Sequence, residues 1–287
     1  MKHLLLTLCL SGTAFLAGAQ VSQLPKNYTS QLNVVYTRVG PWEGKMDLYL
    51  PKSDKPVPVV VHIHGGGFTH GSKESQREKD FGTFFDMNFA VANISYRLAG
   101  TAAAPAAIED ARCAVAYLVQ HASELNIDVT KIVTHGSSAG GHLALMAGLL
   151  ALSNTFAERC PNIYAKVAAI VDICGPADLT TWQAMKKANK ASRAWLGGRE
   201  NDMDFVRSLS PITYVDKNSP PVFIAHGNAD RTVPYAQSQA LESKLKEAGV
   251  QVEFYTVENG GHAFSQSQRS AANQAMAEFL KKVLDRE

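Results

Sequence analysis

The 287-residue sequence predicts an α/β protein with a mostly parallel, eight-stranded sheet and helices on both faces. From about residue 57 onward, short apolar runs rich in β-branched residues alternate with segments of helical periodicity, as in βαβ units. Several runs, such as 57–63 and 167–173, are apolar throughout, which indicates strands buried on both faces. Hydrophobic residues make up 46% of the chain and charged residues 19%, so the composition can supply a sizeable core.

The individual elements follow from this alternation. Strands are predicted over residues 33–39, 45–50, 57–63, 89–94, 131–134, 167–173, 221–226 and 251–257. The first two follow one another without a helix, so we expect them to be antiparallel, and the later ones to be joined by right-handed crossovers. Helices are predicted over residues 75–87, 105–122, 140–150, 235–248 and 268–284. Pro105 suits the first turn of its helix and Gly249 the end of another.

A segment near 178–218 interrupts the pattern. It has no strand character and contains Trp182 and Trp195. We interpret it as a small insertion between strands that could cover a pocket, and the sequence leaves open whether it closes over the site.

Residues 1–19 have the features of a signal peptide. Lys2 and His3 precede an apolar run over residues 4–16, and Ala17-Gly18-Ala19 offers the small residues that a signal peptidase reads. A membrane anchor is the alternative, but the run is shorter than the roughly 20 residues that span a bilayer. We therefore expect cleavage after Ala19, export to the periplasm or medium, no membrane span, and a single domain over residues 20–287.

Three cysteines remain after such cleavage: Cys113, Cys160 and Cys174. An odd number leaves at least one thiol free. Cys160 and Cys174 flank opposite ends of the strand predicted over 167–173, too far apart to bridge easily. We interpret all three as partly buried thiols. No Cys/His cluster has zinc spacing, so no metal site is predicted.

The charge distribution excludes one class of partner. The formal net charge is +2 and the pI is near 8.3. Lysine and arginine are scattered along the chain and form no basic stripe, so no nucleic-acid partner is predicted.

The sharpest functional signal is Gly136-Ser137-Ser138-Ala139-Gly140, between the strand predicted over 131–134 and the helix predicted over 140–150. In a Gly-x-Ser-x-Gly pattern the central serine sits on a tight strand-to-helix turn that exposes its hydroxyl at the positive end of the helix. Ser138 is therefore the candidate nucleophile.

A glycine run, His64-Gly65-Gly66-Gly67-Phe68, directly follows the strand over 57–63. Acyl transfer needs N–H donors aimed at the oxygen that becomes negative, and glycines leave those groups bare. Gly66, Gly67 and Ala139 are thus the predicted oxyanion-hole residues, although a flexible glycine turn is the alternative.

A base and an orienting acid are expected late in the chain. Asp230 lies just past the strand over 221–226, and His262 just past the strand over 251–257. Imidazole activates the serine, and a buried carboxylate fixes the imidazole tautomer. The order Ser138, Asp230, His262 is that of α/β-hydrolases. Asp172 and Asp178 are rival acids.

The other histidines have weaker claims. We interpret His62, His135 and His226, which border strands, and His142, on the helix after Ser138, as packed or hydrogen-bonded structural residues.

With these motifs the chain resembles the α/β-hydrolase esterases that carry a His-Gly-Gly-Gly oxyanion motif. These are the hormone-sensitive-lipase-like group, and the chain is most similar to its compact bacterial feruloyl and acetyl-xylan esterases. The segment Tyr96-Arg97-Leu98 and the helix containing Asp110 resemble family features. The resemblance implies a structural Arg97–Asp110 ion pair and hydrolysis of carboxylic esters through an acyl-enzyme, with no metal or organic cofactor.

Two departures from the family shape the expected substrate. Ala99-Gly100-Thr101 replaces the usual Ala-Pro-Glu, and the long N-terminal cap of many lipase-like members is missing. The second departure disfavours long-chain lipids and favours short acyl groups or acids displayed on a polysaccharide. The side chains that could wall such a pocket, or could equally be core, are Phe68, Trp182, Trp195 and Phe264.

Two other functions fit the same fold. A serine exopeptidase would use the same triad, and a non-catalytic binding protein would typically lack one of its members. The sequence leaves open the ester, the alcohol and the oligomeric state.

Overall fold

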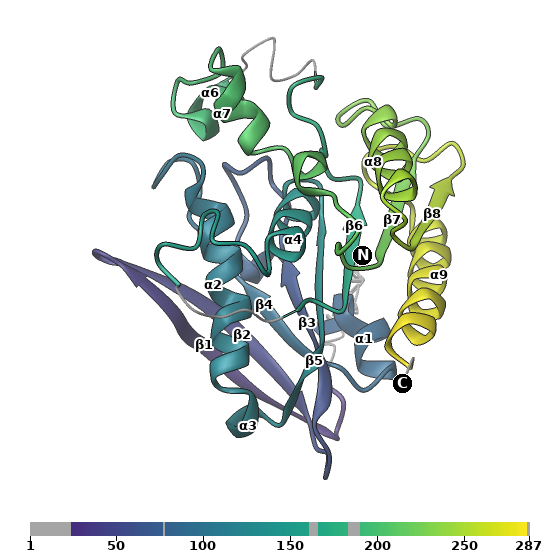
Figure 1. The fold of residues 1–287 in the computed structure, drawn as a ribbon. Helices are drawn as coiled ribbons and strands as arrows, with labels where there is room; N and C mark the ends of the chain where they lie inside the picture. Colours follow the sequence, from purple (N-terminus) through teal and green to yellow (C-terminus); the bar gives the residue numbers. More distant parts are fainter. Residues whose placement is uncertain (1–23, 77, 161–165, 183–189, 286–287) are drawn as a thin grey trace, which may run out of the picture.

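The computed structural model describes residues 24–76, 78–160, 166–182 and 190–285 (Figure 1). The predicted signal peptide, residues 1–19, lies outside these ranges. Eight strands form one sheet in the order β1-β2-β4-β3-β5-β6-β7-β8. Their bounds are β1 Tyr28–Val39, β2 Trp42–Pro51, β3 Val57–Ile63, β4 Ala90–Ile94, β5 Ile127–Ser137, β6 Ala169–Ile173, β7 Val222–Gly227 and β8 Val252–Val257. β1 and β2 are antiparallel to their neighbours and the rest of the sheet is parallel, so the predicted fold class is confirmed.

Helices cover both faces of the sheet. On one face lie α2 (Ala106–Gln120), α4 (Ala139–Leu149) and α8 (Ala236–Glu247), whose apolar side chains share one buried core. On the other face α1 (Gly82–Asp86) and α9 (Gln266–Leu284) form a second core. A short helix, α3 (Ala122–Leu125), links α2 to β5. Across the described ranges, no helix has both the length and the hydropathy to cross a bilayer.

The helix predicted over residues 75–87 is broken. The chain instead forms 3-10 turns at Lys73–Ser75 and Glu78–Phe81 before the five residues of α1. Lys73 is buried, and its ammonium lies 2.9 Å from the carboxylate of Asp47 on β2. This contact fixes the residues just before the predicted helix to the sheet, and Gln76 then adopts an extended backbone (φ −112°, ψ 147°) that ends the first 3-10 turn.

The predicted insertion near 178–218 contains α6 (Lys190–Leu196), α7 (Met203–Ser208) and a 3-10 turn at Pro211–Tyr214, without a strand in its described part. Trp195 of α6 stacks on Phe68, in the loop after β3, with ring centroids 3.9 Å apart. The insertion is therefore anchored beside the carboxyl end of the parallel strands.

The prediction of three thiols was wrong, because Cys113 and Cys160 form a disulfide with Cα atoms 5.3 Å apart. Cys113 and Cys160 are 47 residues apart in the sequence. In the structure the chain after α4 turns back along α2, where Arg112 donates hydrogen bonds to the carbonyls of Leu150 and Ser153 at 2.8 and 2.6 Å. This turn brings Cys160 to α2, while Cys174 stays buried and free.

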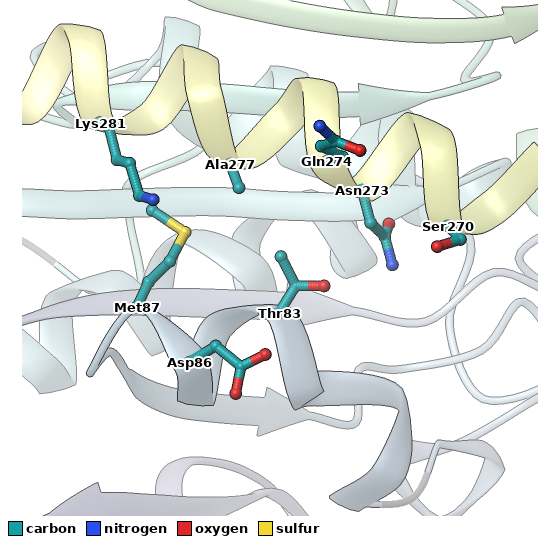
Figure 2. A pocket seen from close by; sticks show the side chains of 8 residues that line it. All are labelled: Thr83, Asp86, Met87, Ser270, Asn273, Gln274, Ala277 and Lys281. Atoms are coloured by element: carbon teal, nitrogen blue, oxygen red, sulfur yellow. The ribbon is translucent and has the colours of Figure 1, made fainter.

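A hollow of about 300 Å³ lies between α1 and α9 (Figure 2). Asp86 and Met87 line one side, and Asn273 and Lys281 the other. It contains none of the residues predicted to be catalytic.

Candidate active site

Ser138 occupies a strained turn between β5 and α4. Its backbone has φ 56° and ψ −123°, a conformation that L-residues rarely adopt. A Cβ at Gly140 would collide with the carbonyl oxygen of Ile63, so the glycine lets α4 approach the end of β3. The Ser138 N–H donates to the Ile173 carbonyl at 2.8 Å, and its carbonyl accepts from the His142 N–H at 3.1 Å. The turn therefore holds the Ser138 backbone in place between β5 and α4, the strand-to-helix position that the Gly-x-Ser-x-Gly motif predicts.

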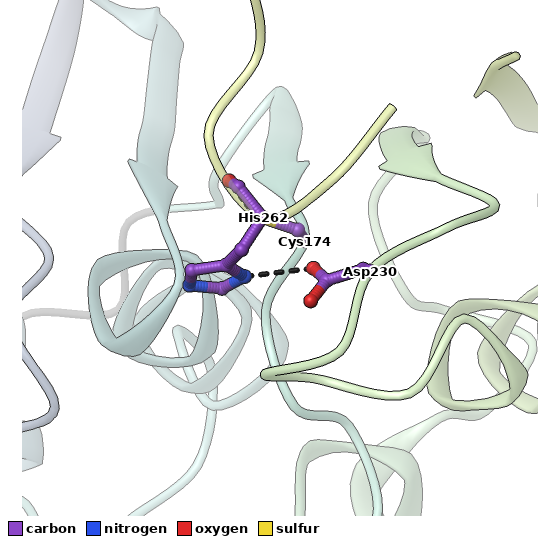
Figure 3. Close-up of side chains that lie close together, drawn as sticks. All are labelled: Cys174, Asp230 and His262. Carbon is purple, nitrogen blue, oxygen red and sulfur yellow. Dashed lines mark hydrogen bonds and ion pairs between the residues drawn. The ribbon is translucent and has the colours of Figure 1, made fainter. Parts of the chain in front are cut away.

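The structure brings the three residues predicted as a triad into one hydrogen-bonded series. His262 Nε2 lies 2.9 Å from Ser138 Oγ, and His262 Nδ1 lies 2.7 Å from Asp230 Oδ2. Asp230 follows β7 and His262 follows β8, at the same end of two neighbouring parallel strands. Figure 3 shows the contact between the two side chains. Because a carboxylate only accepts, Nδ1 carries the hydrogen and Nε2 is left to accept the hydroxyl proton.

Both oxygens of the Asp230 carboxylate accept hydrogen bonds. Its Oδ1 accepts the backbone N–H groups of Thr232 and Val233 at 2.7 and 3.0 Å. Burial by itself would raise the pKa of this carboxyl, but the hydrogen bonds from His262 and these amides outweigh it and lower the pKa. Asp230 is therefore ionised and fixed at the position where it orients His262.

His226 also contacts the acid, which the sequence did not reveal. Its Nε2 lies 3.1 Å from Asp230 Oδ2 and 3.0 Å from the Val233 carbonyl oxygen, while its Nδ1 lies 2.7 Å from the Ser238 hydroxyl. A carbonyl only accepts, so Nε2 carries the hydrogen and Nδ1 accepts from Ser238. Burial lowers the pKa of His226, so the ring is neutral. The predicted structural interpretation of His226 is thus incomplete, because this histidine also orients Asp230.

The glycine run lies against the Ser138 turn. Gly66 has φ +125°, and a Cβ there would meet the His70 carbonyl, so only glycine fits. A Cβ built on Gly65 would lie 3.5 Å from the Ser138 Cβ, which places the run beside Ser138. In the part of the chain that the structure describes, neither Gly66 nor Gly67 donates its N–H to another protein group. Ala139 is the first residue of α4, whose N–H has no intrahelical acceptor.

Residues of the Tyr96-Arg97 segment pack against the start of the same loop. The His64 ring stacks on Tyr96 at 4.3 Å, and the Tyr96 hydroxyl donates to the His64 carbonyl at 3.1 Å. The ion pair that the resemblance implied is present, with Arg97 Nη2 2.8 Å from Asp110 Oδ1 in a buried position. The Tyr96 contacts therefore hold His64, the residue at the start of the glycine run, in place.

The aromatic residues predicted to wall a pocket do not form one group. Phe68 and Trp195 are 3% and 1% exposed, and they stack on each other with His142 at their edge. Trp182 is half-buried against the same core. Phe264 packs against the opposite core, on the α9 side of the sheet. Their role in binding substrate stays a prediction.

The rival acids lie elsewhere. Asp172, on β6, is buried; its Oδ1 accepts the Gly175 N–H at 2.9 Å, and its Oδ2 has no partner within the described residues. Burial raises the pKa of Asp172 to about 7. Asp178 accepts hydrogen bonds from the backbone and hydroxyl of Thr180. Of the three candidate acids, Asp230 is the one that accepts a hydrogen bond from His262 within the described residues.

Comparisons with solved structures agree with this architecture. A truncated carbohydrate esterase from gut microbiota superposes with a TM-score of 0.80 at 27% identity, covering 90% of this chain and 97% of that one. A bifunctional GH43-CE protein of Bacteroides eggerthii gives 0.79 at 29% identity, covering 88% of this chain and 35% of that one.

Curated relatives point the same way. Esterase LipQ and esterase LipC of Mycobacterium tuberculosis are each 27% identical to the chain, over 83% and 80% of its length. The matched regions span 58% and 59% of those two proteins.

The BD-FAE family model matches residues 46–245, well over half of the chain. This range contains the glycine run, Ser138 and Asp230, and β8 and α9 complete the sheet and its second core beyond it. The chain therefore has the α/β-hydrolase fold and belongs to the BD-FAE family.

Proposed function

We propose that this chain is a serine carboxylic ester hydrolase that acts through an acyl-enzyme on Ser138. The observation that carries the proposal is the series from Ser138 Oγ through His262 to Asp230, with spacings of 2.9 and 2.7 Å. The backbone N–H groups beside Ser138 supply the second requirement, which is stabilisation of a developing oxyanion.

The geometry supports a two-step reaction. His262 Nε2 takes the hydroxyl proton as Ser138 Oγ attacks the ester carbonyl, and the N–H groups of Gly66, Gly67 and Ala139 receive the carbonyl oxygen as it becomes negative. The imidazolium then gives its proton to the departing alcohol, which leaves an acyl group on Ser138. Water, activated by the same imidazole, hydrolyses this acyl-enzyme. Asp230 stabilises the imidazolium during both steps.

We infer short-chain or carbohydrate-linked esters as the substrate class. The two structural neighbours at 27% and 29% identity are titled a carbohydrate esterase and a bifunctional GH43-CE protein, and the matched curated relatives are named esterases. These names give no support to the serine exopeptidase alternative. The complete series of Ser138, His262 and Asp230 argues against a non-catalytic binding protein.

Export remains part of the proposal. The residues that suggest a signal peptide, 1–19, lie outside the described ranges. The Cys113–Cys160 disulfide supports an oxidising compartment, because such bonds persist outside the cytosol.

The test is hydrolysis of p-nitrophenyl acetate by the purified chain and by its Ser138→Ala variant. We expect the substitution to lower kcat by several orders of magnitude, since the nucleophile is lost. Equal rates for the two proteins would overturn the proposal. Acetylated xylan, methyl ferulate and p-nitrophenyl esters of increasing chain length, measured with the same pair, then define the ester class.

A further inference from the structure

A free thiol lies beside the His262–Asp230 pair. Cys174 follows β6 with a left-handed backbone, φ 47°, and its N–H donates to the Ala225 carbonyl at 2.9 Å. The thiol is 2% exposed and donates to the His262 carbonyl oxygen at 3.8 Å. The reaction described above does not use it.

Three different metal-binding groups converge at this point (Figure 3). The Sγ of Cys174, a carboxylate oxygen of Asp230 and a ring nitrogen of His262 all lie within 4.8 Å of one another. Thiolate, imidazole and carboxylate are the ligands that hold Zn²⁺ in proteins. Two donors on one tetrahedral ion are separated by ~3.5 Å, so shifts of about 1 Å would bring all three onto a single ion.

We propose that Cys174, His262 and Asp230 form an inhibitory site for a soft or borderline divalent cation such as Cd²⁺ or Zn²⁺. The Asp230 carboxylate is already fixed by two backbone amides and by His226. The His262 side chain is 26% exposed, so one of the three ligands is open to solvent. Mg²⁺ and Ca²⁺ prefer oxygen ligands, so a site with sulfur and nitrogen donors discriminates against them.

A cation bound at this site inhibits catalysis because it changes the tautomer of the His262 imidazole. The Cys174 S–H releases its proton to solvent when sulfur coordinates the ion. His262 coordinates through Nδ1, whose proton leaves that nitrogen while Nε2 gains one, so the ring stays neutral. Nε2 then donates to Ser138 Oγ and can no longer accept the hydroxyl proton. The ion thus inactivates Ser138 without contacting it.

Binding is tested first, because this readout does not depend on the proposed function. Titration of the chain that follows cleavage after Ala19 with Cd²⁺ should produce the ultraviolet absorbance of a Cd–thiolate bond, and Ser138→Ala should retain it. Cys174→Ala should lose it, because Cys113 and Cys160 are joined in the disulfide; Cys174→Ser is the conservative substitute if the alanine variant does not fold. An absorbance that is missing in the parent, or unchanged by both Cys174 substitutions, would overturn the proposal.

Inhibition is the second readout, and it rests on the proposed ester hydrolysis. With p-nitrophenyl acetate, micromolar Cd²⁺ or Zn²⁺ should inhibit the parent reversibly, Mg²⁺ at the same concentration should not, and a chelator should restore the rate. Cys174→Ala should be at least 10-fold less sensitive. Equal sensitivity of the two proteins would contradict the proposal. A parent that is inactive before any metal is added would instead refute the proposed function, while leaving the absorbance test decisive for the metal site.

Discussion

Two carboxyl groups at the ends of neighbouring strands have opposite ionisation behaviour. Asp230, after β7, accepts hydrogen bonds on both oxygens, and its pKa is lowered. Asp172, on β6, accepts one bond from the Gly175 amide, and burial raises its pKa to about 7. The two side chains are both buried, so burial alone does not decide ionisation. The number of hydrogen-bond donors around each carboxyl group decides its ionisation. Only an ionised carboxylate, such as that of Asp230, can orient a histidine base.

The largest expected effect comes from neutralising the acid that contacts His262. Asp230→Asn should lower kcat/KM for p-nitrophenyl acetate by about 10⁴-fold, because the amide no longer fixes the Nδ1–H tautomer. Asp172→Asn is the matched control and should change the rate by less than about 10-fold. Similar losses in the two variants would show that the carboxylates do not differ as described.

A smaller loss is expected when the second histidine on Asp230 is removed. His226→Phe leaves Asp230 with one donor fewer, and the resulting misorientation of His262 should cost on the order of 10- to 100-fold in kcat with little change in KM. His226→Gln can still donate to Asp230 and should recover part of the rate. A purely packing role for His226 would instead make the two variants equally active once both are folded.

The smallest effect is the contribution of Asp172 to the pH dependence of the protein's stability. Its pKa is about 7 in the folded state and near 4 in the unfolded chain, so the folded state binds the extra proton between those values. This group therefore contributes stability below pH 4 that is lost as the pH rises toward 7, at about 1 kcal/mol per pH unit.

Asp172→Asn should remove that slope, because the amide stays neutral. Urea unfolding at pH 5 and pH 7 measures the free energy of unfolding of both proteins. The variant should gain stability relative to the parent between pH 5 and pH 7. An unchanged difference between the two proteins would mean that Asp172 is ionised in the folded state.

Local sequence signals predicted the strands, and they also pointed to Ser138, Asp230 and His262, which the structure brings into one hydrogen-bonded series. The Ser138 turn could be located because a strand, a small-residue motif and an apolar helix follow one another within the sequence. Asp230 and His262 could be placed because parallel strands end at the same edge of the sheet. Each of these positions follows from the order of strands, motifs and helices along the chain, which can be read from the sequence.

Features that depend on packing between distant elements could not be predicted. The Cys113–Cys160 disulfide needs the chain after α4 to fold back along α2, for which no local pattern exists. The segment predicted as a helix over 75–87 is interrupted at Gln76, whose backbone is extended, next to the buried ion pair between Lys73 and Asp47 of β2. His226 gave one usable signal, its position four residues before Asp230 at the end of a strand, but its partners depend on how α8 presents Ser238.

The most direct test of the central claim is covalent labelling of the native protein by a fluorophosphonate, followed by peptide mass analysis. Activation of Ser138 by His262 and Asp230 predicts one adduct per chain, located on Ser138, and strongly slowed labelling in His262→Ala. An unlabelled protein, or an adduct on another residue, would contradict the assignment of Ser138 as the nucleophile.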